Sequence, residues 1–358
     1  VLRSGVADKL FEAAAAWLGR IPGGLGIATA LAGAGFGAIC GSSTAAAATL
    51  SATSLSSMEK HGYDIHLAAG VVAISGTLAM LIPPSIAMVV YGLIADVNIS
   101  RLLLAGVLPG FLVMGTIMLT TYVLVKLGKD RSSQPHLTSL RHKLLLLRHA
   151  LPVVFLFGSV TGVIYTGIAT PTEASAIGAM AAGLLYFLSG QATFIGFWDL
   201  VGRATRTSCM LALILFGAHL FSTFFALTQS AQGLITLLGT LDIPGWVIIF
   251  CLSLIYLALG CFMDQMGVLV LTVPLVAPLV HSLGYDLIWF GVIIIVIAEL
   301  GMITPPVGLN CFVVSKYSNI PVESVFRGAA PYVVAMLVAI ALLLVFPQIS
   351  LWLPNQMI

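Results

Sequence analysis

Polar residues interrupt two long apolar stretches of this chain, and their types are those that bind hard cations. The segment 41–44 (Gly-Ser-Ser-Thr) lies between arms rich in alanine and glycine, and 264–265 (Asp-Gln) lies between the apolar segments 247–259 and 268–280. Hydroxyl and carboxylate oxygens suit Na⁺, particularly where backbone carbonyls face them. A carboxylate this deep in an apolar context is expected to be functional. The alternatives are a hydrogen-bonded structural carboxylate and, for the serines, close helix packing.

A pair of adjacent prolines follows each polar interruption. The segments 82–85 (Ile-Pro-Pro-Ser) and 304–308 (Thr-Pro-Pro-Val-Gly) fall in the middle of apolar runs. Proline removes a backbone N–H and clashes with the carbonyl four residues earlier, so two in succession break a helix. Within a membrane such a break is tolerated where it lines a polar cavity, and the freed carbonyls can bind a cation. A simple proline kink is the alternative, and a pair of breaks at corresponding positions argues against it.

These features belong to an internal duplication. The segment 62–64 (Gly-Tyr-Asp) recurs at 284–286, an offset of 222 residues, and the same offset superimposes the two proline pairs without a gap. In the same register lie Gly106 and Gly328, Pro109 and Pro331, Ser42 and Asp264, and Ser43 and Gln265. A shared helix start, proline pair and Gly-x-x-Pro in one register indicate a repeat.

The elements that must position these residues are membrane helices. The chain has 358 residues, of which 59% are hydrophobic and 8% are charged, with a mean hydropathy of +1.10. A soluble domain carries about 25% charged residues, so a soluble enzyme, a nucleic-acid binder and a disordered protein are excluded. Apolar runs long enough, or nearly so, to cross a bilayer lie at 71–95, 102–125, 144–169, 174–188, 210–227, 247–263, 287–303 and 330–346. The sequence therefore predicts an all-α polytopic membrane protein.

The predicted organisation is two units joined by a basic linker. Residues 1–126 form the first repeat, with a re-entrant hairpin at about 23–58 and a broken helix at about 64–96. Residues 149–358 form the second repeat, with a hairpin at about 245–282 and a broken helix at about 286–317. The linker at 127–148 and its flank carry a basic cluster composed of Lys126, Lys129, Arg131, Arg141, Lys143 and Arg148. Such a cluster predicts a cytoplasmic linker, with an anionic-partner site as the alternative.

The two units are expected to be inverted in the membrane. The first ends in the basic cluster, whereas the segment 348–358 that ends the second has no charged side chain. Inverted repeats are typical of secondary transporters, and a duplicated scaffold without transport is the alternative. The second unit has about 75 more residues, 151–227, ahead of its aligned part, whereas only 22 precede Gly23, and the chain begins with Val1. We therefore expect about two spans to be missing from the N-terminus.

The motifs, taken together, resemble the large, DctM-like membrane subunit of TRAP transporters. The resemblance covers essentially the whole chain in order. It rests on 3–11 (RSGVADKLF), 23–25 (GGL), 41–43 (GSS), 62–64 (GYD), 82–85 (IPPS), 105–110 (AGVLPG), 170–173 (TPTE), Asp264 and 304–308 (TPPVG). It implies Na⁺-driven uptake of an organic acid, usually a carboxylate, across the bacterial inner membrane by an elevator motion. The implied partners are a periplasmic substrate-binding protein and a small four-helix membrane subunit, with Na⁺ as coupling ion, no other cofactor and no nucleic acid.

The resemblance also implies particular site residues. The sodium ligands carried over by motif are Ser42, Ser43, Ile82 and Pro84 in the first half, and Asp264, Gly301 and Thr304 in the second. Hairpin N-termini and hydroxyls are expected to hold the substrate carboxylate, and the candidates are Ser43, Thr44, Ser85 and Gly308. Where the family often has glycine, this chain has Ala79, which weakens the first sodium site without excluding it. Glu299, one turn before the second break, is a further candidate for coupling.

Two rival functions are open at this stage. The first is a stand-alone cation-coupled dicarboxylate carrier or antiporter that needs no binding protein. The second is an intramembrane hydrolase that uses Ser42 or Ser43 with His219. Because no Gly-x-Ser-x-Gly elbow surrounds the serines and no acid pairs with His219 in sequence, the prediction is a transporter rather than an enzyme.

Overall fold

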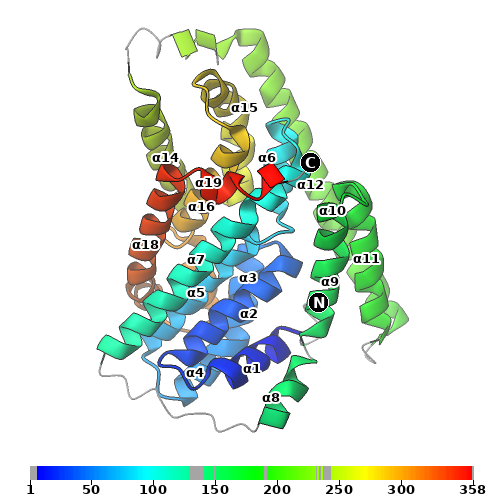
Figure 1. Cartoon of the computed structure of the whole chain (residues 1–358), viewed down its shortest axis with the longest axis vertical. Helices are drawn as coiled ribbons and strands as arrows, with labels where there is room; N and C mark the ends of the chain where they lie inside the picture. The colour runs from blue at the N-terminus through cyan, green and yellow to red at the C-terminus, as the bar shows by residue number, and fades with distance from the viewer. Residues whose placement is uncertain are drawn as a thin grey trace.

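A computed structural model of the chain describes residues 6–128, 140–148, 150–188, 192–230, 232–233, 235–236 and 243–356. All regular secondary structure within these ranges is helical (Figure 1). Five of the described helices are long and apolar enough to cross a membrane, and a bent helix pair would make a sixth span. The prediction of an all-α polytopic membrane protein is confirmed.

The first part of the chain folds into a helical hairpin, a bent helix pair and a long helix. Its elements are α1 (Val6–Leu18), α2 (Gly24–Cys40), α3 (Ser43–Leu50), the π-helical turn η1 (Ser51–Leu55), α4 (Ser56–Lys60), α5 (Ile65–Leu81), α6 (Ile86–Ile94) and α7 (Ile99–Leu127). The helices α5 and α6 meet at an angle of 45° at the first proline pair. The apolar run at 71–95 is therefore two helices, because neither proline can donate the hydrogen bond that would continue α5.

The second part repeats this order after an additional group of helices. The additional elements are α8 (Leu140–Leu147), α9 (Leu151–Phe157), η2 (Gly158–Gly162), α10 (Val163–Tyr165), α11 (Pro171–Leu188) and α12 (Phe194–Thr228). The repeating ones are α14 (Gly245–Phe262), α15 (Gln265–Ser282), α16 (Leu287–Gly301), α17 (Leu309–Ser318) and α18 (Val322–Val345), followed by α19 (Gln348–Leu351) and η3 (Pro354–Gln356). The apolar run at 144–169 spans the end of α8 and all of α9, η2 and α10.

The duplicated Gly-Tyr-Asp segments are helix starts in both parts. Gly62 and Gly284 have φ of 76° and 80°, a left-handed conformation that glycine adopts without steric cost. Asp64 caps α5 by accepting the backbone N–H groups of residues 66 and 67, at 2.8 and 3.0 Å. Asp286 caps α16 in the same way through residues 288 and 289, at 2.7 and 3.2 Å. Equivalent sequences thus begin the two helices that later break.

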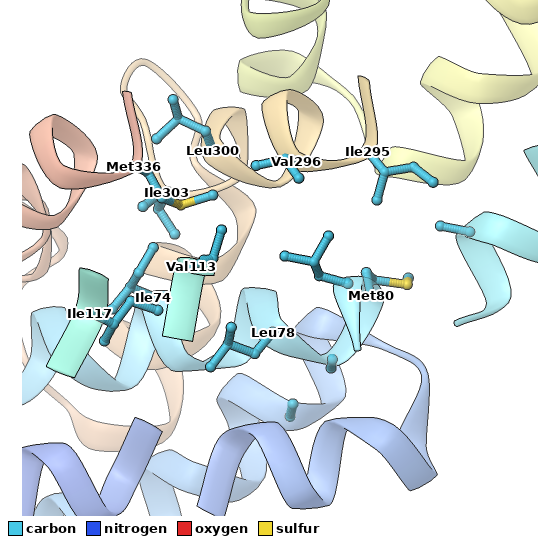
Figure 2. Close-up of a cluster of buried hydrophobic side chains, with 14 of the residues drawn as sticks. Ile74, Leu78, Met80, Val113, Ile117, Ile295, Val296, Leu300, Ile303 and Met336 are labelled. Carbon is cyan, nitrogen blue, oxygen red and sulfur yellow. The ribbon is translucent and has the colours of Figure 1, made fainter. Parts of the chain in front are cut away.

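The hydrophobic core joins the two parts of the chain. Figure 2 shows Ile74 and Leu78 of α5 facing side chains of α7, α16 and α18 across one apolar cluster. Nearly every residue of α5 and α16 is buried, whereas Ala218 is the one buried residue of α12. In Figure 1 α12 runs up one side of the molecule, above α9–α11 and away from α14 and α18, and it packs against α15 and α6. The broken helices therefore lie at the centre of the fold, and α12 lies at its edge.

The helices α5 and α18 cross at two glycines. A Cβ atom on Gly328 would overlap the backbone carbonyl of His66, and one on Gly70 would overlap the backbone of Gly328. Small residues allow membrane helices to approach this closely. Nearby, the hydroxyls of Thr121 on α7 and Tyr332 on α18 lie 2.9 Å apart. The first part is thus held against the last long helix by backbone contact.

The basic linker is described only in part. Of its cluster, Lys129 and Arg131 lie outside the described residues, as does the segment 129–139. Lys143 on α8 is buried, and its ammonium lies 5.7 Å from the centroid of the Trp17 ring. The Trp17 indole N–H also donates to the Lys143 carbonyl at 3.4 Å. These contacts fasten α8 to α1, the first described helix.

Candidate cation and substrate site

The first polar tip is the segment 41–44, where α2 and α3 meet, and the first break is the segment 82–85 between α5 and α6. The tip and the helices beside it pack against the helix that ends at this break. Gly41 ends α2 with φ of 61°, and Ser42 caps α3 by accepting the Ala45 N–H at 3.4 Å. A Cβ on Gly37 would lie 2.5 Å from the Cα of Ala79, the residue that stands where the family often has glycine. The methyl group of Ala79 therefore fills space that Gly37 leaves open. Gly37 and Ala79 are thus in close contact, and the predicted weakening of the first sodium site by Ala79 stays a prediction.

The second tip is the segment 261–265 between α14 and α15, and the second break is the segment 304–308 after α16. Here glycines lie on both sides of the contact, Gly260 beside the tip and Gly301 beside the break. Asp264 caps α15, accepting the Met266 N–H at 3.1 Å. The Gly308 N–H of the break donates to the Cys261 carbonyl of the tip at 3.4 Å. A Cβ on Gly301 would lie 2.5 Å from the carbonyl carbon of Gly260. The tip and the end of α16 are therefore in backbone contact.

This contact predicts that Gly301→Ala impairs transport, whereas Ala79→Gly does not. The added methyl on residue 301 has no room against Gly260, so the second tip must move away from the break. Overpacking of this kind lowers the free energy of unfolding by about 1–3 kcal/mol. Uptake by the two variants at matched protein levels would test this expectation. Equal uptake by Gly301→Ala and the unsubstituted protein would contradict it.

Each tip also contacts the broken helix of the other part. The Ser43 hydroxyl lies 3.5 Å from the sulfur of Met302, directly after α16. The helix α3 packs against α17, and α15 packs against α6. The Gln265 side-chain amide donates to the Ile295 carbonyl of α16 at 3.4 Å. Both tips and both breaks therefore form one connected region.

The breaks expose oxygen atoms that a cation could use. In the part of the chain that the structure describes, the carbonyls of Ile82 and Pro84 accept no hydrogen bond. The Gly301 carbonyl accepts the Thr304 N–H at 3.0 Å, and the Thr304 hydroxyl donates to the Leu300 carbonyl at 2.7 Å. A carbonyl or hydroxyl oxygen that already has one partner retains a second lone pair. This donor set of carbonyl, hydroxyl and carboxylate oxygens fits Na⁺.

The predicted substrate residues do not form one open surface. The hydroxyls of Ser42 and Thr44 lie 3.3 Å apart on the first tip and are partly buried. Ser43 is 1% exposed, as is Ser85, whose hydroxyl donates to the Met80 carbonyl and accepts the N–H of residue 88. Gly308, with φ of 58°, lies in the second break, and its N–H contacts the second tip through the Cys261 carbonyl. The structure thus places Ser43 and Thr44 on the first tip and Gly308 beside the second, with Ser85 buried within the first break.

The sequence did not predict a role for Asn310, and it did not predict that Glu299 and Gln265 would be this deeply buried. Glu299 is 1% exposed, and Asn310 and Gln265 are completely buried. Asn310, on α17, was not singled out because its repeat counterpart is Met88, so the duplication gives no signal there. One feature of the sequence could have identified Asn310: it is the one amide side chain in the apolar segment 307–314. Polar residues at membrane depth are expected to be functional.

The fold and the site together define a class of protein. Polar tips that meet paired broken helices in an all-α membrane protein are the architecture of a secondary transporter. The hydrolase alternative has no support in the structure, because His219 is exposed on α12 whereas Ser43 is buried at the first tip.

The chain belongs to the DctM family, the "Tripartite ATP-independent periplasmic transporter, DctM component", whose model matches residues 1–349. It is 35% identical to the C4-dicarboxylate TRAP transporter large permease protein of Pseudomonas aeruginosa and 32% identical to the sialic acid TRAP transporter large permease protein of Vibrio cholerae. Each alignment covers 98% of this chain and 82% of the relative. The fold is similar to that of the Alcanivorax borkumensis YdaH transporter, with a TM-score of 0.63, 18% identity, and coverage of 99% of this chain and 85% of that one.

Membership of this family defines what the chain is. It is a large permease subunit of a tripartite transporter, in the bacterial inner membrane, and not an enzyme. The predicted TRAP resemblance is confirmed.

Proposed function

We propose that this chain is the transport subunit of a Na⁺-coupled importer of organic acids. The observation that carries the proposal is the meeting of each polar tip with a helix break, which gathers carbonyl, hydroxyl and carboxylate oxygens at related positions. In the first half the proposed Na⁺ ligands are Ser42, Ser43 and the carbonyls of Ile82 and Pro84. In the second half they are Asp264, the Gly301 carbonyl and Thr304. Support comes from the two unpaired carbonyls of the first break and from the backbone contact at the second.

The proposed substrate is a carboxylate. Two of the relatives are named for C4-dicarboxylates and for sialic acid, and both compounds carry a carboxylate group. The tip hydroxyls of Ser43 and Thr44, the N-terminal amides of α3 and the backbone at Gly308 are the proposed contacts. Helix N-termini favour anions, so these groups suit a carboxylate without an arginine.

The proposed mechanism couples the ion to closure of the tips. Na⁺ at the second site neutralises Asp264, and a neutral site can enter a low-dielectric environment at lower cost than a charged one. The occupied tips then close over the substrate, and the hairpins move with α5, α6, α16 and α17 as one body. Buried side chains of all these helices belong to one apolar core, which supports movement as a unit. In that core α5 and α16 also face α7 and α18 (Figure 2). The exposed helix α12 is proposed to belong to the fixed scaffold against which this body moves.

The proposed partners are a periplasmic binding protein and a small four-helix membrane subunit. The family description, a component of a tripartite periplasmic transporter, supports them. A stand-alone carrier would instead transport without a binding protein.

Replacing Na⁺ by choline is expected to reduce uptake to the level of protein-free vesicles. The experiment reconstitutes the permease with its small subunit in proteoliposomes and adds the binding protein loaded with labelled substrate. Because the coupling ion supplies the driving force, uptake should also collapse when the Na⁺ gradient is removed. Unchanged uptake in choline would disprove Na⁺ coupling, and unchanged uptake without the binding protein would favour the stand-alone carrier.

A further inference from the structure

Three side chains near the second break carry buried polar atoms without hydrogen-bond partners. These are both carboxylate oxygens of Glu299, both side-chain amide atoms of Asn310 and the Oε1 atom of Gln265. Glu299 is 1% exposed and the other two are fully buried. A buried polar atom left unpaired costs about 1–3 kcal/mol, and a charged group costs more. A group of such atoms requires an explanation in terms of what they bind.

The three residues lie along one stretch of chain, the end of α16 and the residue that follows it. Gln265 donates to the carbonyl of Ile295, which lies one turn before Glu299. The Asn310 backbone N–H donates to the carbonyl of Met302 at 2.9 Å, one turn after Glu299. The helices α15 and α17 therefore place Gln265 and Asn310 at the two ends of the segment 295–302, which contains Glu299.

The surroundings of Glu299 favour a positive ion. The Ser43 hydroxyl lies close enough to donate to the Glu299 carboxylate, and the Asp264 carboxylate lies close enough to repel its negative charge. Among the described residues no lysine, arginine or histidine forms an ion pair with Glu299. All but one of the unpaired atoms of these three side chains are oxygens. The exception is the Asn310 amide nitrogen, and the oxygen of the same amide can still bind a cation. A group in which oxygen acceptors outnumber donors, and in which the Glu299 and Asp264 carboxylates lie near each other, matches a cation rather than an anion or a neutral molecule.

Glu299 and Asn310 have no chemical equivalents in the first half, whereas Gln265 corresponds to Ser43. At the repeat offset Glu299 corresponds to Thr77, which is also buried but donates to the Ile74 carbonyl at 2.7 Å and is satisfied. Asn310 corresponds to Met88. The duplicated tip-and-break sites therefore do not account for Glu299 and Asn310. Whatever these residues bind is additional to the pair of sites that the repeat defines.

We propose that Glu299, Asn310 and Oε1 of Gln265 form a further Na⁺ site, present in the second half alone. It is distinct from the neighbouring site of Asp264, Gly301 and Thr304. The two ions would lie close together, and each would be attracted by both the Glu299 and the Asp264 carboxylates. The inference rests on the proposed Na⁺ coupling and adds one ion to each transport cycle. An additional ion raises the driving force for uptake by one further Na⁺ electrochemical gradient.

Equilibrium binding of ²²Na⁺ to the purified complex of the permease with its small subunit tests this site without substrate. The Glu299→Gln complex is expected to bind one Na⁺ fewer than the unsubstituted complex, or to bind that ion at least about tenfold more weakly. The reason is that the substitution removes a charge from a low-dielectric site while keeping the side-chain volume. Asn310→Leu removes a ligand without changing the charge and is expected to lose the same ion. It keeps the test available if Glu299→Gln does not fold.

The control variant is Glu323→Gln, in the first turn of α18, where the carboxylate is exposed. It is expected to bind as many ions as the unsubstituted complex. The inference is overturned if Glu299→Gln and Asn310→Leu both keep the full number of ions at unchanged affinity, or if Glu323→Gln loses an ion as they do. If the unsubstituted complex binds no ²²Na⁺ at all, the proposed Na⁺ coupling itself is wrong, so the two failures are distinguishable.

Discussion

Replacing Asp264 by asparagine is expected to reduce Na⁺-driven uptake at least about a hundredfold, which corresponds to about 2.7 kcal/mol. Asp264 caps α15 through the Met266 N–H, and an asparagine oxygen in the same place would preserve this cap. The variant should therefore fold normally and lose only the negative charge that is proposed to attract the ion. The measurement is uptake into proteoliposomes under a fixed Na⁺ gradient, with protein levels matched.

Asp286→Asn is the matched control for this prediction. Asp286 is also a carboxylate N-cap of an apolar helix in the same half, and it accepts two backbone N–H groups. Because asparagine caps helices as well as aspartate does, Asp286→Asn should keep uptake within about twofold. If both variants lost uptake equally, the effect would belong to helix capping. Normal Na⁺-dependent uptake by Asp264→Asn would equally contradict an ion-binding role for Asp264.

The second large effect is expected for Gly328→Val, which should leave little stable protein in the membrane. Even a Cβ on Gly328 would overlap the carbonyl of His66, so valine must force α18 away from α5. Overpacking costs about 1–3 kcal/mol where the neighbours can yield and more where the obstacle is backbone. The loss is measured as the fraction of monodisperse protein that remains after heating in detergent.

Gly115→Val is the control, because a Cβ on Gly115 in α7 would have no neighbour within 4 Å. It lies in a long apolar helix, as Gly328 does, so the helix propensity of valine affects both variants alike. Gly115→Val should resemble the unsubstituted protein. A Gly328→Val variant as heat-resistant as Gly115→Val would disprove the backbone contact between α5 and α18.

The sequence was informative wherever one residue type has a strong local effect. The proline pairs predict breaks, and the structure has α5 ending at Leu81 and α16 at Gly301. The Gly-Tyr-Asp segments mark helix starts, since glycine permits the left-handed turn and aspartate accepts the first amides. The two hairpin tips are visible in the composition alone: one is a polar segment between arms rich in alanine and glycine, and the other is a lone carboxylate between two apolar segments. These signals, together with the scarcity of charge, were enough for the fold class and for the family resemblance.

What the sequence did not predict depends on contacts between residues far apart in the chain. Gly106 and Gly328 are equivalent in the repeat, yet a Cβ on Gly106 would meet Met88 of the neighbouring α6, whereas Gly328 packs against α5. Equivalent sequence positions thus acquire different neighbours, because α7 and α18 contact different helices at these two positions. The unpaired state of Asn310 is likewise a property of packing, and no local pattern reports it.

The contacts of each tip with the other half have a thermodynamic consequence. Ser43 of the first tip lies against Met302, and α15 of the second hairpin packs on α6, so neither tip can be ordered without affecting the other half. In the proposed Na⁺-coupled mechanism linkage is reciprocal: an ion that favours the closed arrangement at one tip raises the affinity for an ion at the other tip by the same factor. Partly loaded states are then depleted relative to empty and fully loaded ones. A carrier with few partly loaded states wastes little of its ion gradient, because leakage of ions without substrate must pass through them.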